Sequence, residues 1–342
     1  MSHRFTFRAA AAIAVVGALA LAGCSSSAEP DEGEAAASDG TFPVTIQHAF
    51  GETTIEEAPT DVVTWGWGST EASIALGVVP VAIPFDSYAG GDDGVLPWVS
   101  EELDGLGVDT PIVLSNDGEA PPYEEIAAAD PDVILAVYSG LTEEQYELLS
   151  EIAPTVAYEG EAWSTPWKDV VTTVGTALGK SEEADTVLAD LDQVLADSAA
   201  AHPELAGKTV AAVWDVAGTF YVYKAADPRV AFLFDLGLVN APAVDELSNG
   251  DETFYYTLSY EQLDKLDSDI VVNYSDTAAE QEAFLAAPYA QAIPAVKAGA
   301  VAQVVGTEVV ASVSPPTALS LTWGLDDYLD SLSAAAAVVD AK

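Results

Sequence analysis

The residues best suited to bind a ligand are aromatic side chains and one arginine that follow predicted strands. In an α/β sheet, ligands lie beyond the carboxyl ends of the strands. We expect a ligand to be contacted by Trp67, Tyr88, Tyr138, Trp214, Tyr223, Arg229 and Tyr274. Such a lining suits a bulky, partly apolar ligand held by stacking and shape, although core packing explains any single ring equally well.

Arg229 is the only arginine after residue 8. It follows Asp227 and Pro228, a pattern typical of a helix N-cap and first turn. A cation at this end opposes the helix dipole, so another interaction is expected to favour it. A guanidinium group can bind ligand oxygen atoms, but a solvated surface position fits the sequence equally well.

The chain is poor in residues that perform catalysis or bind metals. Cys24 is the single cysteine, and His48 and His202 are the histidines that follow the first ten residues. Two histidines cannot form a site of three histidines and a carboxylate for a transition metal. The motifs G-x-S-x-G, H-E-x-x-H and C-x-x-C do not occur in the sequence. We therefore expect a protein that is not an enzyme and has no metal site or cofactor of its own.

The charge balance is strongly acidic, with 56 Asp and Glu against 10 Lys and Arg. Nucleic-acid binding needs a basic surface, so this balance excludes it as a function. An acidic surface favours solubility and attracts cationic ligands.

The amino terminus has the pattern of a lipoprotein leader. Residues 1–8 are basic and residues 9–21 are apolar, a run too short to span a membrane. The run ends Leu-Ala-Gly-Cys, which resembles a bacterial lipobox and predicts a signal peptide over residues 1–23 and lipidation of Cys24. Residues 24–41 are small and acidic, and are expected to form a disordered tether to the outer face of the cell membrane.

One passage of the sequence occurs twice, at an offset of 137 positions. Residues 123–135 read YEEIAAADPDVIL, and residues 260–272 read YEQLDKLDSDIVV. Each copy predicts a short helix, a tight turn and a buried strand. Glu124 and Glu261 occupy the first helical turn, where the dipole favours glutamate in any case. Their matched placement nevertheless suggests a partner with two matching sites.

The order of predicted elements indicates an α/β fold. We expect two similar α/β lobes, at residues 42–160 and 204–342, joined by connecting helices at residues 161–203, with a ligand cleft between the lobes. The stiff connector is the amphipathic helix predicted over residues 181–200. Ser69 or Thr70 is predicted to cap a helix, and Ser259 with Gln262 has the pattern of a capping box.

Together these features resemble the helical-backbone class of substrate-binding proteins of ABC transporters, which serve iron-siderophore and vitamin B12 uptake. The resemblance covers residues 41–332 and is carried by residues 62–81 and by both copies of the repeat. It implies two lobes that close only slightly on the ligand. It also implies that Glu124 and Glu261 pair with arginines of the two permease subunits, and that Arg229 contacts the ligand.

The expected ligand is an Fe(III)-siderophore complex in which the siderophore holds the iron. Catecholate binders of this class tend to use several arginines, whereas this chain has one after the leader, which favours a neutral or cationic ferric hydroxamate. The expected partners are this ligand, an ABC permease dimer and the membrane that holds the lipid anchor, and we expect a monomer. Residues 66–69 and 90–98 look most like siderophore binders of Gram-positive actinobacteria.

Two alternatives remain open at the level of sequence. A cobalamin or haem binding protein of the same fold is the first, because haem needs an axial Tyr or His and Tyr is plentiful. An extracytoplasmic siderophore hydrolase is the second. It would have to recruit His48 or His202, and the scarcity of histidine argues against it.

Overall fold

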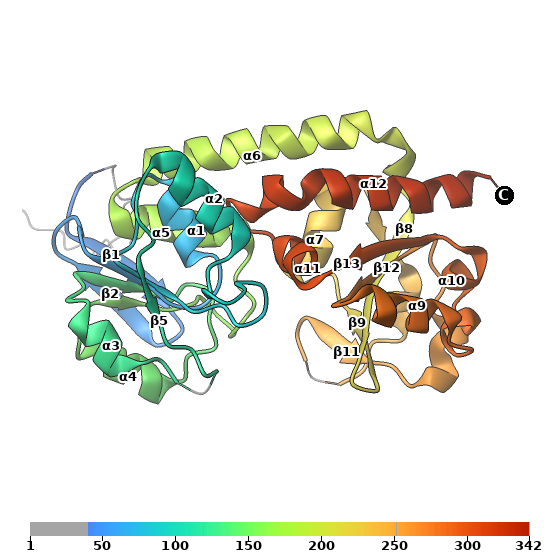
Figure 1. Ribbon diagram of the computed structural model, residues 1–342, viewed down its shortest axis with the longest axis horizontal. Helices are drawn as coiled ribbons and strands as arrows, with labels where there is room; N and C mark the ends of the chain where they lie inside the picture. Colours follow the sequence, from blue (N-terminus) through green and yellow to red (C-terminus); the bar gives the residue numbers. More distant parts are fainter. Residues whose placement is uncertain (1–39, 119, 251, 342) are drawn as a thin grey trace, which may run out of the picture. The chain divides into compact units, whose positions relative to one another are not determined.

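Two larger β-sheets, a separate two-stranded hairpin and the surrounding helices form the described part of the chain (Figure 1). The computed structural model describes residues 40–118, 120–250 and 252–341. The expected α/β fold is confirmed. The predicted signal peptide, Cys24 and all but the last two residues of the tether lie outside the described residues, so those predictions are untested.

The first sheet is entirely parallel, with strand order β5-β4-β3-β6-β7. Strands β3 and β6 are buried along their whole length, and apart from Thr64 their residues are apolar, as is typical of parallel strands covered on both faces. A hairpin of β1 (Val44–His48) and β2 (Gly51–Ile55) precedes this sheet. The strands are β3 (Val62–Thr64), β4 (Ala82–Pro84), β5 (Ile112–Leu114), β6 (Val133–Leu135) and β7 (Thr155–Val156). The helices of this half are α1 (Ser69–Ala75), α2 (Pro97–Leu106), α3 (Tyr123–Ala128), α4 (Glu143–Ser150) and α5 (Trp167–Leu178).

The second sheet is mixed, with strand order β11-β9-β8-β12-β13 and β10 paired to β8. β9 and β11 are the antiparallel members, because β9 returns from β8 through a tight hairpin. The strands are β8 (Thr209–Val216), β9 (Thr219–Tyr223), β10 (Val239–Asn240), β11 (Tyr255–Thr257), β12 (Ile270–Ser275) and β13 (Val301–Val305). The α-helices are α7 (Pro228–Asp235), α8 (Pro242–Glu246), α9 (Ala278–Ala286), α10 (Pro294–Ala298), α11 (Thr307–Val313) and α12 (Ser320–Asp340). The 3-10 turns are η1 (Pro203–Leu205), η2 (Tyr260–Lys265) and η3 (Ala290–Ala292).

The repeat performs the same structural task in each sheet. Its strands are β6 and β12, and the residue before each strand is an aspartate that holds the start of the neighbouring strand. Asp132 Oδ2 accepts hydrogen bonds from Thr60 N (2.8 Å), Thr60 Oγ1 (2.8 Å) and Asp61 N (3.0 Å). Asp269 Oδ2 accepts them from Thr209 N (2.8 Å) and Thr209 Oγ1 (2.9 Å). Each aspartate thus ties the repeated strand to the neighbour against which it is paired.

The two copies differ in their helices. The first copy forms the α-helix α3, whereas the second forms the 3-10 turn η2. The alanines of the first copy favour an α-helix, while η2 closes with i to i+3 bonds such as Leu266 N to Leu263 O. The predicted capping box at Ser259 is wrong, because the Ser259 side chain makes no capping hydrogen bond.

The cap predicted for α1 is also wrong. The N-cap residue is Gly68, with φ of 78°, and no side chain caps the helix. Thr70 instead shares a hydrogen bond of 2.7 Å with Thr64 Oγ1, which joins the first turn of α1 to β3. The cap predicted at Asp227 is confirmed, since its side chain accepts a hydrogen bond from Arg229 N.

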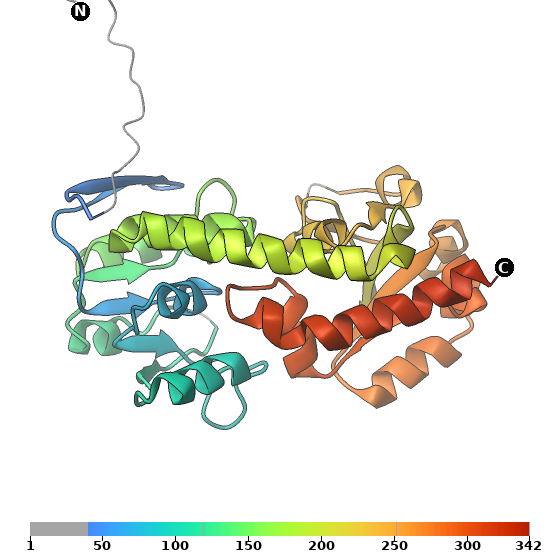
Figure 2. The same ribbon diagram turned by 90° about the horizontal axis from the view of Figure 1, so that it is seen from above.

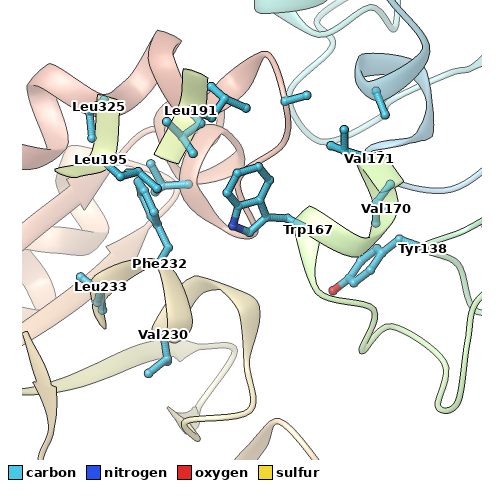
Figure 3. Packing of buried hydrophobic residues seen from close by; sticks show 14 of the residues in the cluster. Tyr138, Trp167, Val170, Val171, Leu191, Leu195, Val230, Phe232, Leu233 and Leu325 are labelled. Carbon is cyan, nitrogen blue, oxygen red and sulfur yellow. The ribbon is translucent and has the colours of Figure 1, made fainter. Parts of the chain in front are cut away.

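Helix α6 (Ser181–Ala201) runs from the half that contains β1–β7 to the half that contains β8–β13 (Figure 2). Its buried residues Ala184, Leu191 and Leu195 belong to a hydrophobic cluster that includes residues of both sheets. Figure 3 shows the ring of Trp167 in this cluster, between Phe232 and Tyr138. The core is therefore continuous through α5, α6 and α7. The lobe boundaries at residues 42–160, 161–203 and 204–342 remain predictions.

Within residues 40–118, 120–250 and 252–341, no helix has the length and apolar character that crossing a membrane requires.

Close packing of α12 on α11 depends on Gly324. A Cβ atom at this position would overlap Ser312 Oγ and lie 2.9 Å from Ser312 Cβ. Gly105 in α2 has no atom within 4 Å of the corresponding point. We expect Gly324→Ala to lower the free energy of unfolding by about 1–3 kcal/mol through overpacking. Gly105→Ala should raise it by about 0.5–1 kcal/mol through helix propensity.

Urea unfolding of both variants, followed by circular dichroism, measures the two changes. Equal effects of the two substitutions would contradict the proposed tight contact between α11 and α12.

Candidate ligand-binding site

The second sheet brings three of the predicted aromatic residues together. Trp214 of β8 and Tyr274 of β12 are register partners, and their ring centroids are 6.2 Å apart. Tyr223 ends β9 and meets the Tyr274 ring edge-on, also at 6.2 Å. Pairs at these separations pack favourably and hold the rings in place.

Arg229 lies over these rings at the start of α7. Its Cζ is 3.8 Å from the centroid of Tyr223 and 5.8 Å from that of Tyr274. Its Nε donates to Asp227 Oδ1 at 2.8 Å, and the two side chains are 13% and 2% exposed. These contacts are the interaction that favours a cation at this helix end. Burial acts to lower the pKa of Arg229, but the Asp227 carboxylate and the tyrosines outweigh it and hold that pKa above its ordinary value.

One nitrogen of this guanidinium has no partner. Among the described residues, Nη1 of Arg229 is buried and makes no hydrogen bond. A buried donor without an acceptor is costly, and a free donor on a cation suits a ligand oxygen that bears negative charge.

The loops of the first sheet supply Trp67 and Tyr138. Trp67 N donates to Tyr138 O at 2.9 Å. Gly66 permits this approach, because it has φ of 86° and a Cβ there would overlap Tyr138 O. Tyr138 is 8% exposed, and its ring meets Trp163 edge-on at 5.6 Å. Tyr138 belongs to the same hydrophobic cluster as Tyr223 and Tyr274 of the second sheet, and burial raises the pKa of its hydroxyl.

Tyr88 connects the two groups directly. Its hydroxyl donates to Asp276 Oδ1 at 2.5 Å, and its ring centroid lies 6.5 Å from that of Trp214. The loop that carries Tyr88 is held by Asp86, whose Oδ1 accepts from Tyr88 N at 3.0 Å and Ala89 N at 2.6 Å. Burial and the bond to Asp276 raise the pKa of Tyr88, so its hydroxyl remains protonated at neutral pH.

A cavity of about 200 Å³ lies on the first-sheet side of these residues. Trp67, Asp86, Asn116 and Trp163 contribute to its lining. Glu71 also lines it, with 1% exposure, and accepts a hydrogen bond from Trp98 Nε1 at 3.0 Å. Burial raises the pKa of Glu71. Glu71 and Asp86 were not singled out from the sequence; the only signal was a carboxylate on a helix that is otherwise apolar and small.

The structure thus joins Tyr88, Tyr138, Trp214, Tyr223 and Arg229 in one group, with Trp67 beside the adjoining cavity. Tyr274 differs, because it is 0% exposed and its hydroxyl faces Tyr328 at 3.4 Å. In this conformation Tyr274 cannot contact a ligand, so it supports Trp214 and Tyr223 from below. Trp323 lies in α12, and its Nε1 donates to Glu101 Oε1 at 3.2 Å.

The two histidines do not form a nucleophile-activating pair. Ser333 Oγ and Glu204 Oε1 both approach Nδ1 of His202, at 2.8 and 3.2 Å, so His202 cannot relay a proton between them. His48 is buried between Thr53 and Tyr146 in the hairpin region, and burial lowers its pKa. In the described part of the chain, no group of three or more His, Cys, Asp or Glu side chains could hold a metal ion.

Glu124 and Glu261 are exposed, in the first turns of α3 and η2. In the range from Gly40 to Ala341 that the structure describes, neither side chain has a hydrogen-bond or ion-pair partner. The residue beside each glutamate is held by hydrogen bonds. Glu125 accepts from Ser115 N (2.8 Å) and Oγ (2.7 Å), and the Tyr260 hydroxyl donates to Asp215 Oδ1 (2.8 Å).

Two sheets whose strand ends and loops meet at an aromatic, arginine-centred site define a binding protein of the two-lobed periplasmic type. The chain belongs to the periplasmic binding protein family, whose family model matches residues 62–304. The resemblance inferred from the repeat and the leader is therefore confirmed.

Relatives are found among proteins of iron uptake. A probable siderophore-binding lipoprotein of Bacillus subtilis (strain 168), YfiY, is 28% identical over 273 residues, covering 77% of this chain and 78% of the relative. The crystal structure of Streptococcus pneumoniae TIGR4 PiaA in complex with ferrichrome has a TM-score of 0.78 at 34% identity, covering 86% of this chain and 99% of that one. A periplasmic solute binding protein of Mycobacterium smegmatis str. MC2 155 has a TM-score of 0.72 at 30% identity, covering 86% and 99%.

The pairing of Asp227 with Arg229 should be essential for stability. Asp227→Ala leaves a buried guanidinium without its carboxylate, and we expect it to lower the free energy of unfolding by about 3–5 kcal/mol. The double variant Asp227→Ala/Arg229→Met removes the unpaired charge and should be less destabilised than Asp227→Ala alone. Urea unfolding of both variants tests this, and a double variant less stable than the single one would contradict it.

Proposed function

We propose that this protein is an extracytoplasmic binding protein, lipid-anchored at Cys24, that captures a ferric siderophore and delivers it to the permease of an ABC importer. The names of the relatives support a ferric siderophore as the ligand, and the predicted leader supports a lipid anchor at Cys24. The relevant binding residues are Trp67, Tyr88, Tyr138, Trp214, Tyr223 and Arg229, with Tyr274 as their support.

The observation that carries this proposal is the buried Nη1 of Arg229, which has no hydrogen-bond partner among the described residues although the guanidinium lies over the Tyr223 ring. A ferric siderophore presents negatively charged oxygens around the metal and an apolar or aromatic periphery. A planar cation backed by Tyr223 can donate to such oxygens, while Trp214 and Tyr138 provide stacking surface. Because Tyr88 bonds to Asp276 across the site, ligand binding requires this loop to move or to be rearranged.

The charge balance favours a hydroxamate. Arg229 is the only arginine beyond the leader, and it is already neutralised in part by Asp227. A strongly anionic catecholate complex would bring several negative charges next to one cation and an acidic surface, which is unfavourable. A neutral or cationic ferric hydroxamate avoids this repulsion.

Haem and cobalamin are the competing ligands. Haem ligation by tyrosine uses the phenolate, but burial raises the pKa of Tyr138 and Tyr223 despite the nearby arginine. This cost argues against haem, and no residue of the group offers a specific feature for cobalamin.

Ligand titration of the soluble protein that begins after Cys24 tests the proposal. We expect ferrioxamine B or ferrichrome to quench tryptophan fluorescence, because Trp214 and Trp67 lie at the site, whereas a ferric catecholate, haem and cobalamin should bind more weakly. Arg229→Lys keeps a cation for Asp227 but loses the planar donor, and should weaken binding about 10–100-fold. Lys224→Gln, which also alters one cation of this half, serves as the control.

Saturation by haem or cobalamin alone would overturn the siderophore assignment. Unchanged affinity of Arg229→Lys for the hydroxamates would show that Arg229 does not contact the ligand.

We further propose that Glu124 and Glu261 dock the two lobes onto the two permease subunits. Both are exposed and lack partners in the described residues, so they are available to arginines of another protein. Exposed ion pairs contribute only about 0.2–1 kcal/mol each, which suits a complex that must dissociate after each delivery.

Charge reversal tests the docking role. The double variant Glu124→Lys/Glu261→Lys should abolish uptake of radiolabelled ferric hydroxamate by cells that lack the native copy, while its affinity for the ligand in solution stays unchanged. The matched control reverses Glu147 and Glu282, which are also exposed, one in each half. Normal uptake with the first variant, or a loss of ligand affinity, would show that these glutamates have another role.

A further inference from the structure

Each proposed docking glutamate is next in sequence to a residue whose side chain forms a hydrogen bond with a neighbour of a ligand-site residue. In the second half, Glu261 follows Tyr260, whose hydroxyl donates to Asp215 Oδ1 at 2.8 Å. Asp215 directly follows Trp214 in β8. The residues Trp214, Asp215, Tyr260 and Glu261 therefore form a continuous series from a ring of the ligand site to the docking turn η2.

The Asp215 carboxylate is shared by two tyrosines. Tyr289 donates to its other oxygen, Oδ2, at 2.6 Å, and the Tyr260 and Tyr289 rings lie 4.3 Å apart. Burial and the bond to Asp215 raise the pKa of Tyr260 to about 12, so its hydroxyl stays protonated at neutral pH. The carboxylate thus holds η2 against β8, the strand that contains Trp214.

The first half has a link of the same kind, with the carboxylate on the docking helix. Glu125 follows Glu124 and accepts two hydrogen bonds from Ser115, through N and Oγ. Ser115 adjoins Asn116, which lines the cavity beside Trp67 and donates through Nδ2 to Phe85 O at 3.0 Å. A movement of the cavity wall would therefore be transmitted to the first turn of α3.

We propose that these two carboxylate-centred links, Trp214–Asp215–Tyr260 and Asn116–Ser115–Glu125, report ligand occupancy to the docking glutamates. The inference rests on the proposed function and adds its regulation. In the protein that carries ligand, Glu124 and Glu261 differ in position and in mobility from the same residues in the empty protein. Tyr260 and Glu125 are positioning residues, because each acts through the glutamate beside it. A permease could then distinguish loaded from empty protein although it touches neither the ligand nor the site.

Hydrogen exchange with and without saturating ferrioxamine B or ferrichrome tests the proposal. In the wild type, ligand should slow amide exchange at residues 213–216, in the site, and also at residues 260–265 and 123–128, by about fivefold or more. Tyr260→Phe should abolish the ligand-dependent change at 260–265 and leave that at 213–216. Tyr289→Phe removes the other hydroxyl from the same carboxylate, and is the matched control in which the change at 260–265 persists.

Glu125→Ala should abolish the ligand-dependent change at 123–128, whereas Glu147→Ala, an exposed glutamate of α4, should preserve it. Protection at 213–216 with none at 260–265 or 123–128 in the wild type would overturn the coupling alone. An unchanged ligand response of η2 in Tyr260→Phe would overturn the route through Asp215. No protection anywhere with either ferric hydroxamate would overturn the proposed function itself, and the coupling with it.

Discussion

The arrangement of the site depends on an aspartate that ties the repeated strand to its neighbour in each sheet. Asp132 and Asp269 accept hydrogen bonds from the start of the adjacent strand, and the bonds from Thr60 N and Asp61 N lower the pKa of Asp132. Because side chains alternate along a strand, a slip of one residue would turn every ring to the opposite face. Pairing from Ile270 with Val210 onward is what places Tyr274 beside Trp214 at the other end.

The second constraint is that Arg229 is a buried cation whose charge is balanced by a single carboxylate, Asp227. In a chain with 56 acidic residues and 10 basic Lys and Arg, a buried cation is unusual and needs compensation. Asp227 provides it through one bond and also caps α7, while Tyr223 covers the guanidinium face. The compensation is incomplete, since Nη1 has no partner among the described residues. The residues that stabilise the arginine thus also leave one of its donors without a partner, which supports the ligand role proposed for Arg229.

Features that depend on local sequence were predictable, and features that depend on side-chain packing were not. The repeat, the parallel strands and the Asp227 cap follow from apolar runs and from short-range backbone chemistry. The repeat alone did not predict that the second copy forms the 3-10 turn η2, in which Tyr260 donates a hydrogen bond to Asp215 of β8. In the same way, the burial of Tyr274 and Glu71 is decided by Tyr328 and Trp98, which are distant in sequence. The one sequence anomaly that did point to tertiary structure was the arginine at a helix start.

The repeat also explains how an acidic protein could present a specific docking surface. With so many carboxylates, negative charge alone cannot tell a permease where to bind. The position of a carboxylate can specify the docking site, because Glu124 and Glu261 each precede the strand-tying aspartate by the same eight residues. The aspartate sets the register of the sheet, and the register sets both the rings at one end and the glutamate in the preceding turn. Under the proposed function, recognition of the ligand and of the transporter would thus derive from one local unit used twice.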